Sequence, residues 1–416
     1  MIARIASILF LLMAANPAAA EDTPDPGRID WDLSGSARAG NFSGSRNLDD
    51  AGDTGTAALW LRAAPKVGEA HVVLEGWVRN DDVTRSGNET SRLREAYVDF
   101  SVGELDFRIG KQIIVWGRAD ELNPTDNLTP RDYTKLVPDS DDQRFGTSGV
   151  KLTEHFHDLA LSAIWLPTFN SNVIPIAPSP GVSYASQARQ INQIAFKLDQ
   201  TGGAIDWSVS YFNGLNLNPD TMIGSISASG LNLVLKNNRI RVLGADAATT
   251  LGQYGLRAEA AYTWTSFYDT MDPLVTKPSF YAVLGADRNF GGDVNLNVQY
   301  YFRRVTGYQD PNGIASPLLR SLAIPEAVIT NQYERVEDGL TARVAANWLN
   351  DTLTGEFTAL YSLTQHDYAL RPKLIYAFND QVKGTIGADV FRGAENTYFG
   401  HFRGLSLAYA EVKCSF

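Results

Sequence analysis

The chain has 416 residues, of which 44% are hydrophobic, 20% charged and 11% aromatic. This composition excludes a disordered or collagen-like chain, and 35 glycines with only 4 methionines favour an aromatic-rich β protein. The net charge of −11 and the absence of Lys/Arg clusters argue against a nucleic-acid partner. The single cysteine, Cys414, excludes an intramolecular disulfide and a thiolate metal cluster.

Residues 1–20 have the pattern of a signal peptide. Arg4 precedes an apolar run from Ile5 to Ala15, and Ala18-Ala19-Ala20 is a small-residue cleavage pattern. The run is shorter than the roughly 20 residues that a spanning helix needs, which disfavours a retained anchor. We therefore expect cleavage, export in a Gram-negative bacterium and a periplasmic leader at residues 21–29.

The mature chain alternates apolar and polar residues in segments of β-strand period. The clearest segment is Asp293 to Arg304, where Val298 lies among the apolar residues and Asn297 among the polar ones. Such segments are longer than ordinary soluble strands and match the roughly 9 to 11 residues that cross an outer membrane. One face therefore suits lipid, and the other suits water.

The connectors between these segments predict the topology. Short turns alternate with long connections at 41–54, 81–90, 116–144, 167–189, 213–238, 267–277, 305–337 and 393–400. Short periplasmic turns on one rim and long extracellular loops on the other are typical of outer-membrane barrels. We predict an all-β fold, a transmembrane antiparallel β-barrel of about 18 strands over residues 30–416. Sixteen strands remain an alternative, because 239–250 and 278–288 are weakly patterned.

The C-terminal segment supports this prediction, because it alternates and ends in Phe416. It resembles the terminal strand that the outer-membrane assembly machinery recognises.

The long connection at 116–144 is the most informative segment. Trp116-Gly117 would mark its exit near the membrane interface, with the indole half exposed, and Pro124 and Pro130 would constrain its path. We expect it to fold into the lumen as a constriction; the alternative is a solvated cap over the outer rim. Its candidate pore residues are Arg118, Asp120, Glu121, Asp126, Arg131, Asp132 and Lys135, joined by Glu95, Asp99 and Arg108 from inward faces of strands.

Enzymatic and metal chemistry find little support. His155-Phe156-His157 is the only close histidine pair, and two imidazoles without further ligands favour a solvated turn over a metal site. The adjacent His366 and Asp367 would point to opposite faces of a strand, so they are a poor catalytic pair. We expect no enzyme activity and no cofactor.

Four short motifs carry a resemblance. They are Arg94-Glu95-Ala96-Tyr97, Gly110-Lys111-Gln112, Trp116-Gly117 and Asn123-Pro124. This part of the chain resembles a poorly characterised group of porin-like proteobacterial outer-membrane β-barrel proteins. The resemblance implies an outer-membrane location, and in some members an association with RND-type exporters or periplasmic carriers that move hydrophobic or lipid-like compounds.

Two functions are consistent with these features. The first is a channel in the lipid outer membrane for passive passage, or partner-assisted export, of small or hydrophobic solutes. The second is a plugged structural or binding barrel whose long loops, 167–189, 213–238 and 305–337, recognise external ligands. An apolar piece of the last loop, Ile314 to Ile329, would either help a hydrophobic solute enter or pack on the rim.

Overall fold

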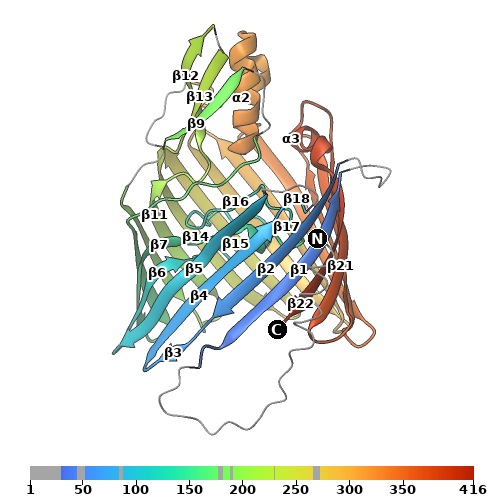
Figure 1. The fold of residues 1–416 in the computed structure, drawn as a ribbon. Helices are drawn as coiled ribbons and strands as arrows, with labels where there is room; N and C mark the ends of the chain where they lie inside the picture. Colours follow the sequence, from blue (N-terminus) through green and yellow to red (C-terminus); the bar gives the residue numbers. More distant parts are fainter. Residues whose placement is uncertain are drawn as a thin grey trace.

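The computed structural model describes residues 30–44, 52–83, 88–176, 181–187, 191–228, 230–265 and 272–416. The predicted signal peptide and the predicted leader at 21–29 therefore both lie outside the described residues. Within them the chain forms a closed antiparallel barrel, with a smaller assembly of strands and a helix above one rim (Figure 1).

The barrel sheet contains 19 strands, one of which, β3 (Lys66–Val67), is only a two-residue hairpin extension; 19 − 1 leaves 18 strands that form the wall. The wall strands are β1 (Leu33–Ser43), β2 (Asp53–Ala63), β4 (Ala70–Asn80), β5 (Glu89–Val102), β6 (Leu105–Gln112), β7 (Thr147–Phe156), β8 (Leu159–Leu166), β10 (Gln193–Gln200), β11 (Asp206–Leu215), β14 (Arg239–Leu251), β15 (Tyr254–Thr265), β16 (Ser279–Phe290), β17 (Val294–Val305), β18 (Val336–Trp348), β19 (Leu353–Ser362), β20 (Tyr368–Ala377), β21 (Val382–Arg392) and β22 (Leu407–Ser415).

The barrel closes where β1 pairs with β22, with Ala37 opposite Cys414. Closure gives every strand two neighbours, so no sheet edge is left to face lipid. Short turns join the strands at one rim. In one of them Gly103 has a φ of +63, a left-handed conformation that glycine adopts without steric cost. The predicted count of eighteen strands is confirmed, including the two weakly patterned segments, which are β14 and β16.

The two faces of the wall differ as the alternation predicts. On β17 the Val298 side chain is 39% exposed and faces outward, whereas Asn297 is 6% exposed and faces the lumen. The outward face is apolar and the inward face is polar. A closed barrel with an apolar outer face belongs in the outer membrane, because lipid provides no hydrogen-bond partners for an open sheet. Among the described residues, no helix is both long enough and apolar enough to cross a membrane.

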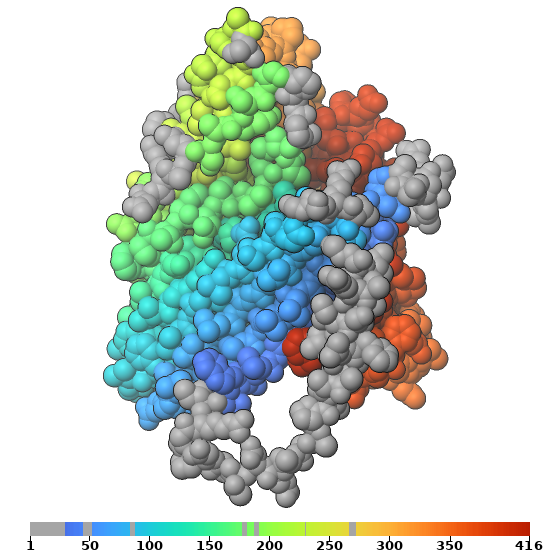
Figure 2. Space-filling view, in the orientation of Figure 1, coloured from blue at the N-terminus to red at the C-terminus, as the bar shows by residue number. Residues whose placement is uncertain are grey.

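Three predicted loops contain regular structure that the sequence did not indicate. Segments 167–189 and 213–238 supply β9 (Val182–Gln187), β12 (Asp220–Ser227) and β13 (Gly230–Lys236), which form a separate sheet in which β13 pairs with both others. The apolar piece of 305–337 contains the helix α2 (Pro317–Ile329). We call β9, β12, β13 and α2 the canopy; Figure 2 shows it standing above the rim.

At each of the predicted connections 116–144 and 393–400, a bordering wall strand stops short of the connection. The segment 104–115 leaves the wall after Gln112, because Ile114 instead pairs with Thr129: its N–H donates to the Thr129 hydroxyl over 2.8 Å. The segment 401–416 joins the wall only at Leu407, after the short helix α3 (Tyr398–His401).

The lipid-facing assignment of β17 is directly testable. Val298→Arg places a charge near the bilayer midplane and should destabilise the assembled barrel by about 2 to 4 kcal/mol. Asn297→Arg, one residue away, faces the lumen and should assemble normally. The folded fraction is measured by heat-modifiable gel mobility and urea titration in lipid vesicles. Equal effects of the two substitutions would contradict this strand register.

Candidate functional site

Residues 116–144, called the lumen loop from here on, fold back into the barrel from the end of β6. Their hydrogen-bond and ion-pair partners lie on strands at distant positions in the chain, including β15, β17, β18 and β20. The segment therefore lies inside the barrel and is not a cap over the outer rim.

One carboxylate on the wall holds the start of the lumen loop. Glu259 of β15 is only 2% exposed. Its Oε2 accepts the N–H groups of Arg118 and Ala119 over 3.0 and 3.1 Å, and its Oε1 accepts the N–H and the hydroxyl of Thr125, each over 2.8 Å. Backbone donors inside a barrel need such an acceptor, and hydrogen bonds to a charged group are stronger than neutral ones.

Gly117 makes this close approach possible. Its φ is +98, a left-handed conformation that side chains rarely adopt. A Cβ at this position would lie 2.6 Å from Oε2 of Glu259. The Trp116-Gly117 pair of the sequence motif therefore marks the point where the chain turns against the wall carboxylate.

Three charged residues next in the chain bind other strands. Arg118 Nε lies 2.5 Å from Asp246 of β14. The Asp120 N–H donates to Gln299 of β17 over 3.0 Å, and its carboxylate lies 3.6 Å from Arg343 of β18. Glu121 lies 3.4 Å from Arg371 of β20. These predicted site residues thus reach across the lumen from β14 to β20.

The side of the lumen loop that packs against the inner wall of the barrel is apolar. Trp116 and Leu128 of the loop, with Ile114 just before it, join a buried cluster with residues of five wall strands, β8, β10, β11, β14 and β15. These residues are Ile164, Leu166, Ala195, Phe212, Ile240, Val242 and Ala261. The prediction of a half-exposed Trp116 at the interface is wrong, since the indole is 5% exposed. The chain has already turned inward at this point, so the ring packs against the inner wall.

The second half of the lumen loop is tied to the opposite wall. Asp132 accepts from Arg92 of β5 over 3.1 Å, and Lys135 Nζ lies 2.5 Å from Asp81. Within the loop, Arg131 donates to the Ser140 carbonyl over 3.1 Å and Asp126 lies 2.7 Å from Arg144.

The remaining predicted residues lie on β5 and β6. Arg108 forms a two-pronged ion pair with Asp99, over 2.7 and 2.8 Å, and Glu95 accepts the Ile113 N–H over 2.8 Å. The β4–β5 register shifts between Glu75 and Gly76, so Arg94 has no partner residue in the ladder. Arg94 therefore reaches the lumen beside Glu95 and pairs with Glu75 over 2.6 Å.

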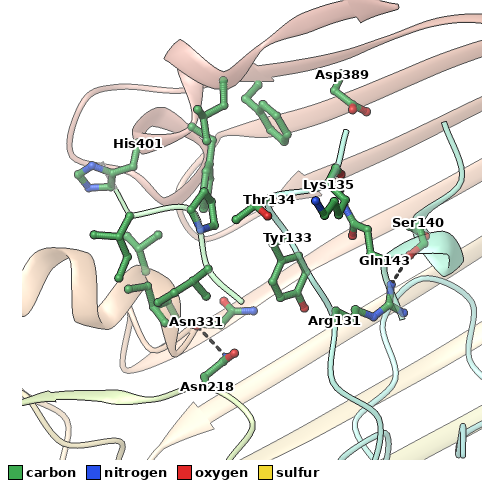
Figure 3. Close-up of a pocket in the computed structure, with 18 of the residues that line it drawn as sticks. Arg131, Tyr133, Thr134, Lys135, Ser140, Gln143, Asn218, Asn331, Asp389 and His401 are labelled. Carbon is green, nitrogen blue, oxygen red and sulfur yellow. Dashed lines mark hydrogen bonds between the residues drawn. The ribbon is translucent and has the colours of Figure 1, made fainter. Parts of the chain in front are cut away.

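A cavity of about 1960 Å³ runs from the canopy into the barrel beside the lumen loop. Tyr97 and Arg108 line it on β5 and β6, Glu121 on the lumen loop, and Arg371 and Asp389 on β20 and β21. Figure 3 shows Arg131 and Lys135 of the loop on one side and His401 on the other.

The charges of this cavity are paired. Each lining Lys and Arg side chain of the described residues is in an ion pair; the pairs are Arg94–Glu75, Arg108–Asp99, Arg131–Asp141, Lys135–Asp81, Arg144–Asp126, Arg303–Glu337 and Arg371 with both Glu121 and Asp389. The wall therefore presents alternating charge and not a field of one sign.

A buried polar cluster attaches α2 to the rest of the canopy. Glu326 of α2 is 2% exposed and accepts the Thr221 N–H over 2.8 Å. Asp220 accepts from Thr276, whose N–H lies 3.1 Å away, and from the Asn238 amide. Burial and the neighbouring Asp220 carboxyl raise the pKa of Glu326 well above its usual range.

Sequence reasoning missed several of these residues. Arg343 and Arg371 occupy lumen-facing positions on their strands, and strict alternation would have found them. Arg94 was not predicted to face the lumen, because the alternation pattern does not reveal the bulge, although Arg94 is part of the Arg94-Glu95-Ala96-Tyr97 motif. The canopy contact between Thr221 and Glu326 joins loops 105 positions apart and leaves no local pattern.

Comparisons with known proteins agree with this architecture. A family model, DUF1302, described as "Protein of unknown function", matches residues 30–270. No curated protein matches the chain.

Solved structures with a similar fold include two from Pseudomonas aeruginosa. OccK5 (OpdH) has a TM-score of 0.52 at 11% identity, over 92% of this chain and 96% of that one. The outer membrane protein opdK has a TM-score of 0.54 at 10% identity, over 92% and 97%. Acinetobacter baumannii OccAB4 has a TM-score of 0.53 at 9% identity, over 94% and 99%. The shared feature at these identities is the fold.

The Glu259 contacts predict how the lumen loop responds to substitution. Glu259→Ala removes the acceptor of three backbone N–H groups, and each hydrogen bond to a charged group contributes about 1.5 to 3 kcal/mol. The amides of Arg118, Ala119 and Thr125 should then exchange with deuterium at least about ten-fold faster. Glu259→Gln keeps a neutral acceptor, so its amide exchange rates should lie between those of the wild type and those of Glu259→Ala. Unchanged exchange in Glu259→Ala would show that the loop is held elsewhere.

The Glu326 cluster predicts a pH-dependent canopy. A carboxyl with a raised pKa in the folded state contributes stability that is present at low pH and lost as pH rises through that pKa. Spin labels on Arg320→Cys and Ser225→Cys, in a Cys414→Ser background, should give a narrow distance distribution at pH 5 that broadens at alkaline pH. Glu326→Gln should stay narrow throughout. Broadening in that variant too would remove Glu326 as the cause.

Proposed function

The chain belongs to the DUF1302 family, and from its porin-like barrel we propose that it is an outer-membrane channel for the passive passage of small solutes. The observation that supports this most directly is the cavity beside the lumen loop, which extends from the canopy to Arg108 on β6 inside the barrel. No catalytic step is part of the proposal.

The lumen loop is the constriction in this mechanism. Its apolar side fills the part of the lumen next to β8, β10, β11, β14 and β15. Solutes therefore pass on the other side, between Glu121 and the wall of β5, β6, β20 and β21. The paired charges of Arg108, Arg371 and Asp389 create a transverse field there, and the width and field of the passage set selectivity.

The direction of transport follows the solute gradient. The resemblance noted from the motifs would add a periplasmic carrier or RND-type exporter and hydrophobic cargo. The apolar residues of the canopy around the cavity, such as Leu233 and Leu322, support hydrophobic cargo. We restrict the proposal to passive passage.

The alternative is a plugged barrel whose canopy binds external ligands. The ties of the lumen loop to both walls favour this second function, since a loop held by Glu259, Asp246 and Arg92 is not free to move aside. Ion conductance separates the two.

A planar bilayer tests the channel. The purified protein should give stepwise currents, and replacing residues 118–142 with a short Gly-Ser linker should enlarge each step, because the obstruction beside β5 and β20 is removed. Absence of current in the wild-type protein, with current after the replacement, would support the plugged barrel, because the lumen loop is then the plug. Equal step sizes would mean that the lumen loop is not the constriction.

A further inference from the structure

The outer part of the cavity is walled by one face of each canopy element. Along α2, Leu318, Leu322, Pro325 and Val328 line the cavity at helical spacing. Ala323, Glu326 and Ala327, on the other face, are buried, and Glu326 there accepts the Thr221 N–H of β12. The cavity face of α2 is thus an apolar stripe that no other element of the described chain covers completely, and Leu318 is 44% exposed.

The canopy sheet presents a second apolar surface to the cavity. Leu231, Leu233 and Leu235 alternate along β13 and line the cavity, as do Val182 and Tyr184 on the paired strand β9. Residues two apart on a strand share a face, so this side of the sheet is directed at the same space as the α2 stripe. Two apolar surfaces from separate loops therefore enclose one volume.

The inner part of the cavity is polar but electrically balanced. Every lining Lys and Arg side chain of the described residues is already paired, as given above, and the acid Glu95 is bonded to the Ile113 N–H. An anion would have to displace a carboxylate from its base, and a cation would have to displace a base. Uncharged hydrogen-bonding groups such as the Tyr133 hydroxyl, at a 45% exposed side chain, stay available (Figure 3).

We propose that this vestibule binds uncharged amphipathic molecules, with the apolar body between α2 and β13 and a hydroxyl-bearing end toward Tyr133 and the lumen loop. The inference rests on the proposed function, because it names the class of solute that the channel would collect before passage. The volume of about 1960 Å³ exceeds that of ordinary small-molecule sites, so the bound molecule is selected by the two surfaces and not by a tight fit.

The proposed vestibule site is tested by varying the alkyl chain length and the charge of a small amphipathic probe. Wild-type protein in lipid nanodiscs is dialysed to equilibrium against radiolabelled methyl, butyl and hexyl glucoside, and binding to empty nanodiscs is subtracted. Because each buried methylene contributes about 0.8 kcal/mol, affinity should rise about two- to four-fold for each added methylene. Hexanoate and hexylammonium should bind at least about ten-fold more weakly than hexyl glucoside, since each would have to break an ion pair.

The apolar stripe is tested by a matched pair of variants. Leu322→Asn combined with Val328→Asn removes apolar lining and should abolish the dependence on chain length. Leu319→Asn makes the same change on α2 at a position that does not line the cavity, and should keep it. If the double variant fails to assemble, Leu318→Asn provides the same readout at an exposed position.

The outcomes separate this inference from the channel. Binding that is independent of chain length, equal binding of hexanoate, or an unchanged slope in both Leu322→Asn/Val328→Asn and Leu318→Asn would overturn the vestibule site, even if the same preparation conducts ions. Chain-length-dependent binding with no conductance would support the site and overturn the channel.

Discussion

The carboxylate of Glu259 is the contact on which the arrangement of the lumen depends. A chain that leaves the wall and enters a barrel brings backbone donors with it, and these donors need partners once water is displaced. Glu259 accepts three such N–H groups and one hydroxyl, and Gly117 provides the room for it. With the loop fixed here, Arg118, Asp120 and Glu121 come within reach of β14, β17, β18 and β20.

Fixing the loop makes the lumen asymmetric. Its apolar residues cover the inner face of β8, β10, β11, β14 and β15, and its charged residues face the remaining space. That space connects with the canopy above, where the walls become apolar. A solute therefore meets an apolar surface first and a set of paired charges second, which is an order suited to molecules that carry both kinds of surface.

The strand pattern was predictable because a barrel wall has lipid on one side and water on the other. This contrast requires apolar and polar residues to alternate along each strand, a pattern that is visible in the local sequence. Val298 and Asn297 are examples. The lumen loop was predictable only in part: its prolines and charges marked it, but its anchor lies 134 to 141 positions away at Glu259. Trp116 was misplaced for the same reason, since its partners on the inner wall are distant in the chain. Arg94 was missed because one bulge reverses the alternation, and α2 because its apolar residues were equally consistent with a loop on the rim.

The central claim is that solutes pass beside the lumen loop at Glu121. Glu121→Cys in a Cys414→Ser background places a single reactive thiol at that point, and a membrane-impermeant methanethiosulfonate reagent then adds bulk and charge there while the current through one barrel is recorded. The account predicts a stepwise fall in conductance as the thiol is modified. Complete modification, verified by mass spectrometry, with an unchanged current would contradict it.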